Sequence, residues 1–180
     1  MKPFSAFTGL AVTATPLIAI DLGYSAQRRS CGLAWTGGEE DLELQFGDAI
    51  HRTAEILRSF DWKAILVVEA VLSTFHQANG NPAVRGRFET GRGWYYRAGV
   101  LSFAAATRFL QCLADLRSNG PAIALAEAFL SNKNTPTGHA EDAATIRDGF
   151  WETQPVDLRE GVEPASNLIE GIPSVRVFEI

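Results

Sequence analysis

Three short apolar segments of the chain each end in an acidic residue. They read LIAID (Leu17 to Asp21), ILVVE (Ile65 to Glu69) and AIALAE (Ala122 to Glu127). Continuous apolar runs of this length are typical of buried β-strands. A carboxylate among buried apolar residues costs several kcal/mol unless it is paired, protonated or bound to a metal ion. The sequence therefore favours a fold in which the strand ends share one charge partner.

A fourth acid lies on an otherwise apolar helix face. The segment HAEDAATI (His139 to Ile146) has helical spacing, and His139 and Asp142 share one face because they are three residues apart. Oxygen ligands are those that hard divalent cations prefer. We therefore expect Mg²⁺ or Mn²⁺ to be the shared partner. The candidate catalytic acids are Asp21, Glu69, Asp142 and Glu127, and the first three are also the candidate metal ligands.

Each of these residues also has a purely structural interpretation. Asp21 could cap the turn that follows it, since Asp before Leu-Gly is common turn chemistry. Glu69 could cap a turn or pair with an arginine. Asp142 could be a first-turn acid that the helix dipole favours, and His139 a structural histidine rather than a metal ligand, proton shuttle or phosphate contact.

The remaining segments alternate between strands and helices. Residues 31–35 and 41–46 have the pattern of two strands, of which the first returns antiparallel. We expect helices at 47–60, at about 94–117 and from about 135–137 to 151. The expected inner side of the second helix consists of Val100, Phe103, Ala104, Thr107, Leu110 and Leu113. The segment 75–96 is rich in Gly and Pro and has the pattern of a long loop.

Length and composition indicate one soluble globular domain. The chain has 180 residues, 46% hydrophobic and 21% charged. We expect a core over about 16–153 and an acidic segment over 154–180 that wraps the domain or forms its edge, ending in the strand-like SVRVFEI. Two cysteines far apart favour a reduced, cytoplasmic protein. A cationic start and an apolar run near residues 2–20 could pass for a weak signal peptide, but polar residues and a proline interrupt it.

Taken together, these elements resemble a known superfamily. The segment IAIDLGYSAQRRSCGLAW resembles the first hairpin of the ribonuclease H-like superfamily, and ILVVEAVLS resembles its fourth strand. HAEDAATI resembles the final-helix motif of RuvC-like resolvases and of a related family of uncharacterised predicted nucleases. The resemblance covers about 17–151. It implies an α/β fold, a ribonuclease H-like mixed sheet with helices on both faces and the order β-β-β-α-β-α-β-α.

The resemblance also implies a function. Members of this superfamily use clustered carboxylates to bind one or two divalent ions, so it implies a metal-dependent nuclease or phosphodiesterase. The expected partner is then DNA, RNA or a nucleotide, and not a membrane; a homodimer is compatible with the sequence. The superfamily has an acid at the position of Glu127 only in some branches.

One basic and aromatic cluster stands out in a chain of net charge −5. It runs from Arg85 to Arg97, and its arginines suit phosphate while its aromatic residues can stack on bases. The candidate substrate-binding residues are His139, Lys133, Arg85, Arg87 and Arg92. The alternative is a loop anchored by its aromatic side chains, with arginines that pair with nearby acids.

Two further alternatives stay open. The first is a non-catalytic module that keeps the scaffold and acts through a protein partner, which the acidic balance favours because phosphate binding needs Lys and Arg. The second rests on IAIDLG, which also resembles the first phosphate loop of actin- and Hsp70-type ATPases. Those proteins need two such domains and a second Gly-rich loop, for which 180 residues leave no room.

Overall fold

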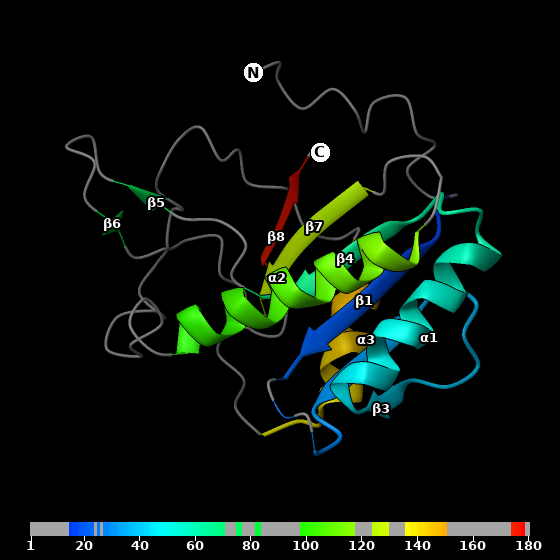
Figure 1. Cartoon of the computed structure of the whole chain (residues 1–180), viewed down its shortest axis with the longest axis horizontal. Coiled ribbons are helices and arrows are strands. Elements are labelled where there is room, and N and C mark those ends of the chain that lie inside the picture. The colour runs from blue at the N-terminus through cyan, green and yellow to red at the C-terminus, as the bar shows by residue number, and fades with distance from the viewer. Residues whose placement is uncertain are drawn as a thin grey trace.

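The structure is a computed structural model of the whole chain, shown in Figure 1, and it describes residues 15–23, 25, 27–70, 75–76, 82–83, 98–117, 124–129, 136–150 and 174–178. Its elements, in chain order, are β1 (Leu17–Leu22), β2 (Cys31–Trp35), β3 (Leu42–Leu44), α1 (Phe46–Ser59), β4 (Ile65–Glu69), β5 (Phe75–His76), β6 (Pro82–Ala83), α2 (Ala98–Leu116), β7 (Ala124–Phe129), α3 (His139–Gly149) and β8 (Ser174–Phe178).

A six-stranded mixed sheet forms the centre of the molecule. Its strand order is β3-β2-β1-β4-β7-β8. The three central strands β1, β4 and β7 are parallel, while β2, β3 and β8 each run antiparallel to a neighbour. The predicted α/β class and the antiparallel hairpins at the front of the sheet are confirmed. The tail segment was expected to wrap the domain or form an edge, and its strand β8 forms one of the two edges of the sheet.

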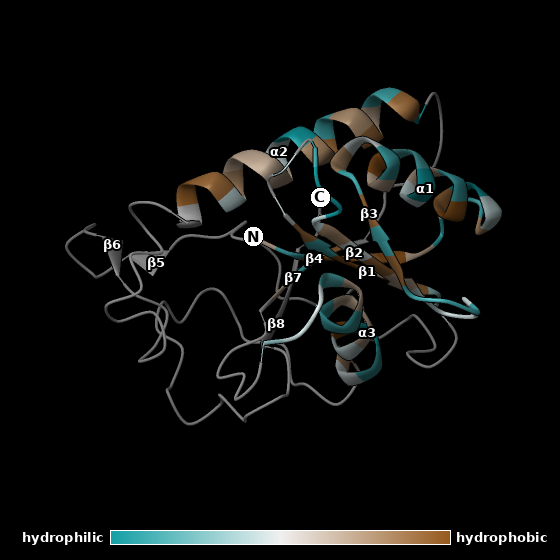
Figure 2. Cartoon of the chain, turned by 90° about the horizontal axis from the view of Figure 1, so that it is seen from below, coloured by the Kyte–Doolittle hydropathy of each residue, from teal (hydrophilic) through white to brown (hydrophobic). Residues whose placement is uncertain are grey.

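Helices cover both faces of this sheet. Figure 2 shows α1 and α2 on one side and α3 on the other. Side chains alternate between the two faces along β1: Ile18 and Ile20 pack into the core under α1 and α2, whereas Leu17 and Ala19 pack with Ile146 of α3. The same alternation divides β4. The expectation that β4 is covered on both faces is therefore confirmed.

The predicted inner side of helix α2 is only partly right. Leu113 is buried and Leu110 packs against the core as predicted, but Val100 and Phe103 are 55% and 51% exposed, and the buried Phe109 was not predicted. The helix is apolar on nearly all sides, so its sequence is compatible with more than one buried face. Packing against α1 selects the face, with the ring of Phe109 edge-on to Phe46 at 6.3 Å between centroids.

Two expected boundaries also differ. Helix α3 begins at His139, later than predicted, because Gly138 at its N-cap is extended. The predicted loop 75–96 contains the two-residue strands β5 and β6, which pair with each other. A ladder of two residues is too short to leave a periodic pattern in the sequence.

The start of α3 lies directly on strand β2 because Gly32 has no side chain. A Cβ atom at Gly32 would stand 1.7 Å from the backbone carbonyl oxygen of His139 and 2.7 Å from the amide nitrogen of Ala140. These neighbours are backbone atoms, so they cannot rotate aside. Gly32 therefore sets how closely α3 approaches the sheet.

Two observations concern the thiols and the helices of the described residues. Cys31 and Cys112 are both free. Burial raises the pKa of the Cys31 thiol to about 11, so this cysteine is protonated at neutral pH. Among the described residues, none of the helices combines the length and the apolar character that a membrane crossing needs.

The close approach of α3 yields a stability prediction. Gly32→Ala should lower the free energy of unfolding by about 2 kcal/mol or more, because α3 must move off the sheet to admit a methyl group. Gly47→Ala is the matched control, since a Cβ at Gly47 in the first turn of α1 meets nothing within 4 Å. Urea denaturation of both variants measures the difference. Equal stability of the two variants would contradict the close contact.

Candidate metal centre

Two of the predicted acids stand side by side on the central strands. Asp21 near the end of β1 is the register partner of Glu69 at the end of β4, and the two strands are parallel. Both side chains lie on the α3 face of the sheet. Asp21 comes two residues after Ala19 and Glu69 two residues after Val67, and both Ala19 and Val67 pack on that face. The sheet alone therefore brings two carboxylates to one position.

The third acid comes from helix α3, which covers this position. Asp142 lies in the first turn of α3 and is only 5% exposed. One carboxylate oxygen from each of Asp21, Glu69 and Asp142 lies within 4.8 Å of the other two. The expected convergence of these three residues is thus present in the structure. We refer to them as the acid cluster.

The acid cluster has the chemistry of a divalent cation site. Its donors are all carboxylate oxygens, the ligand type of Mg²⁺, Mn²⁺ and Ca²⁺. Asp21 and Asp142 are 9% and 5% exposed, so these two carboxylates are largely shielded from bulk water, and charges interact more strongly there than in water. Oxygens on opposite sides of one ion stand about 4.2 Å apart for Mg²⁺ and about 5 Å apart for Ca²⁺. A mutual separation within 4.8 Å is compatible with one ion or a close pair.

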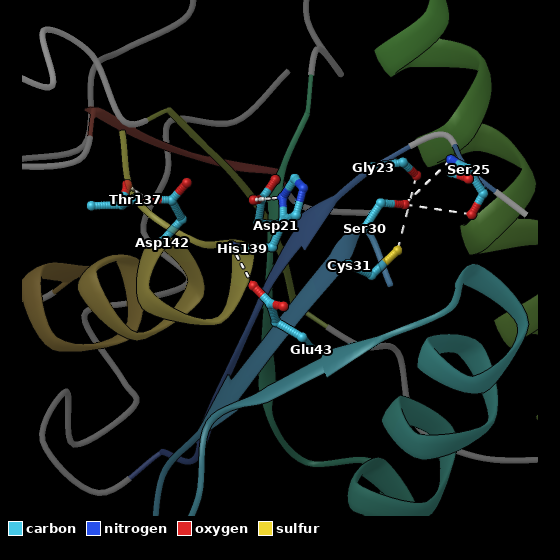
Figure 3. Close-up of polar contacts among 9 residues, drawn as sticks. All are labelled: Asp21, Gly23, Ser25, Ser30, Cys31, Glu43, Thr137, His139 and Asp142. Atoms are coloured by element: carbon cyan, nitrogen blue, oxygen red, sulfur yellow. Dashed lines mark hydrogen bonds and ion pairs between the residues drawn. The ribbon is translucent and has the colours of Figure 1, made fainter. Parts of the chain in front are cut away.

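His139 contacts the acid cluster directly. Its Nδ1 atom lies 2.5 Å from Oδ2 of Asp21. Figure 3 shows the imidazole directed at the Asp21 carboxylate. The hydrogen bond to Asp21 raises the pKa of His139 above its ordinary 6.5; partial burial opposes this, and the nearby charges of Asp21, Glu43 and Asp142 add to it. When protonated, which the raised pKa favours, the imidazole supplies positive charge beside Asp21. Its side chain is also 41% exposed, so the ring lies at the solvent edge of the cluster.

Two residues that sequence reasoning missed hold the start of α3 and its acid. The hydroxyl of Thr137 donates a hydrogen bond to Oδ1 of Asp142. Oε1 of Glu43 on β3 accepts a hydrogen bond of 3.1 Å from the backbone N–H of His139. The alternation in DLELQF offered a signal for Glu43, because it places this acid on the face of the strand that is opposite to Leu42 and Leu44. Nothing in the sequence relates Thr137 to Asp142.

The expectation that Glu127 lies at the metal site is wrong. Glu127 is fully buried in β7, but its register partner is Val68, whose side chain packs under α1 and α2. The partner of Glu69 is instead Ala128. A shift of one residue along a strand moves a side chain to the opposite face. Glu127 is therefore not a member of the acid cluster, and it has interaction partners of its own.

Four of the five predicted substrate-binding residues are not among the residues that the structure describes. Arg85, Arg87, Arg92 and Lys133 lie outside the described residues. Their roles stay predictions.

The His139–Asp21 pair predicts a pH dependence of stability in metal-free protein. Because the folded pKa of His139 is raised, the pair stabilises the fold fully below the unfolded value of 6.5 and loses this contribution as pH rises through the folded value. The stability difference between the parent and His139→Gln should therefore be larger at about pH 6 than at about pH 9. Urea unfolding in EDTA measures it, and His51→Gln, on the exposed side of α1, controls for loss of an imidazole. A difference that stays constant or grows with pH would contradict the ion pair.

Comparison of the chain with protein-family models, with curated proteins and with solved structures finds no match.

Proposed function

We propose that this protein is a metal-dependent nuclease or phosphodiesterase that binds Mg²⁺ or Mn²⁺ through Asp21, Glu69 and Asp142. The observation that carries the proposal is the convergence of three carboxylates from two strands and a helix within 4.8 Å. Residues far apart in the chain meet there in largely buried positions, which favours a site over chance crowding on a surface. Such a cluster is the usual means of holding the ions of phosphoryl-transfer enzymes.

The arrangement of elements supports the finer fold assignment. Three antiparallel strands are followed by a parallel pair, β4 and β7, and the helices follow in the order expected from the ribonuclease H-like resemblance. The positions of the acids on β1, β4 and α3 also support this assignment, because the resemblance implies carboxylates on these elements. We therefore assign the domain to a ribonuclease H-like architecture as part of the proposal.

In this proposal the chain's own residues have distinct tasks. A divalent cation, when bound, would bind the scissile phosphate and activate the attacking water. Asp21 and Glu69 are fixed by strand pairing, and Asp142 is oriented by the hydroxyl of Thr137. His139 holds a proton beside Asp21 and is partly exposed, so it can also donate a hydrogen bond to an approaching phosphate. Arg85, Arg87, Arg92 and Lys133 are proposed to bind the substrate's other phosphates.

A second candidate function is a non-catalytic module that acts through a protein partner. The contact between His139 and Asp21 favours it, because an imidazolium can offset part of the cluster's negative charge without any metal. The two candidates differ in what added metal should do to the protein.

Metal binding predicts a thermal shift. Millimolar Mn²⁺ or Mg²⁺ should raise the melting temperature by several degrees, because a ligand at about 100 times its Kd stabilises the native state by about 2.7 kcal/mol. Asp21→Asn, Glu69→Gln and Asp142→Asn should each abolish most of this shift. Glu141→Gln is the matched control, since Glu141 is the exposed neighbour of Asp142. A parent protein whose melting is indifferent to both metals would contradict the proposed site.

Catalysis predicts metal-dependent cleavage of at least one substrate class. Purified protein should be assayed on single-stranded and duplex DNA, on RNA and on branched DNA with Mg²⁺ and Mn²⁺. Asp21→Asn and Glu69→Gln should each lower the cleavage rate by about 100-fold or more, because a lost ligand misplaces the ion that the reaction uses. Glu127→Gln should retain cleavage if it folds, since Glu127 lies on the other face. A metal shift without cleavage of any substrate would favour the non-catalytic module.

A further inference from the structure

Helix α3 lacks a cap of its own. Gly138 occupies the N-cap position with extended backbone angles and, as a glycine, has no side chain to accept a hydrogen bond from the first turn. The amide of Asp142 donates to the carbonyl of Gly138, whereas the amide of His139, the first residue of the helix, has no acceptor within the helix. An amide at a helix start needs an acceptor from elsewhere.

Glu43 supplies that acceptor from the sheet. Its Oε1 atom lies 3.1 Å from the backbone nitrogen of His139, although the two residues are 96 positions apart. Gly138 leaves room for it, because a Cβ at Gly138 would stand 2.8 Å from the same oxygen. A carboxylate at a helix N-terminus is also favoured by the helix dipole. Figure 3 shows the Glu43 side chain directed from β3 toward this end of α3.

Glu43 stands in the same row of the sheet as the acid cluster. Register pairs connect Glu43 to Gly32, Gly32 to Asp21, and Asp21 to Glu69. The backbone of His139 lies over Gly32, in the space that a side chain at this position would fill. The first residue of α3 is therefore held from one side by the Glu43 carboxylate and rests on the strand that pairs with β1.

We infer that Glu43 is a positioning residue for the proposed metal site. By fixing the first amide of α3 over Gly32, it sets the position from which His139 reaches Asp21 and from which Asp142 joins the cluster one turn later. Glu43 itself is outside the group of carboxylates that converge within 4.8 Å, so its role is exerted through α3. This inference rests on the proposed metal-binding function.

Metal titration of the full chain tests the inference. Glu43→Ala should raise the Mn²⁺ concentration needed for the half-maximal thermal shift by about 10-fold, the usual effect of losing an outer-shell partner. Glu43→Gln should stay within about threefold of the parent, because its amide oxygen can still accept from His139. Glu40→Ala, an exposed acid just before β3, removes the same charge without the contact. Equal weakening in all three variants would show a charge effect and overturn the positioning role.

A second measurement keeps the inference testable if the parent protein binds no metal. In EDTA, the amide of Asp142 should exchange with solvent at least about threefold faster in Glu43→Ala than in the parent, because the first turn of α3 opens more often. Glu43→Gln should exchange at the parental rate. Unchanged exchange in Glu43→Ala would overturn the positioning role. An absent metal response in the parent, with faster exchange in Glu43→Ala, would instead overturn the proposed function and leave Glu43 as the residue that positions α3.

Discussion

Three carboxylates gathered within 4.8 Å and mostly shielded from water repel one another, and this repulsion is the constraint on which the site depends. Like charges at such separations destabilise a fold unless positive charge or protonation offsets them. A protonated His139, 2.5 Å from Asp21, supplies one such charge. A divalent cation would supply more. Without such an offset, three ionised carboxylates at this spacing oppose folding.

The site forms only because α3 can approach the sheet closely. Gly32 provides the space, Gly138 admits the Glu43 carboxylate, and Glu43 holds the first amide of the helix. Two glycines and one acid thus determine where Asp142 lies relative to β1 and β4. None of the three is itself a candidate ligand. Residues that are not candidate ligands therefore set the geometry of the residues that are.

Much of the fold could be predicted from the sequence because local residue patterns indicate the strands and helices. The apolar runs at Leu17–Leu22 and Ile65–Glu69 are strands, and the helical spacing of Ile50, Ala54 and Leu57 marks the buried side of α1. The pattern failed where it was ambiguous. Helix α2 is apolar nearly all round, so its periodicity did not identify Phe109 as inward and Val100 as outward.

The amino-acid pattern alone identified the acids that lie among apolar residues, because a carboxylate at the end of an apolar run can be recognised without a structure. It could not determine on which face each acid lies, since that depends on strand register. Asp21 pairs with Glu69, whereas Glu127 pairs with Val68 and points the other way. Nor could it relate Glu43 to His139, which only tertiary packing brings together across 96 positions. Strand register and helix docking depend on contacts between residues that are distant in the sequence. A one-residue shift in register moves a side chain to the other face of the sheet without changing the local pattern.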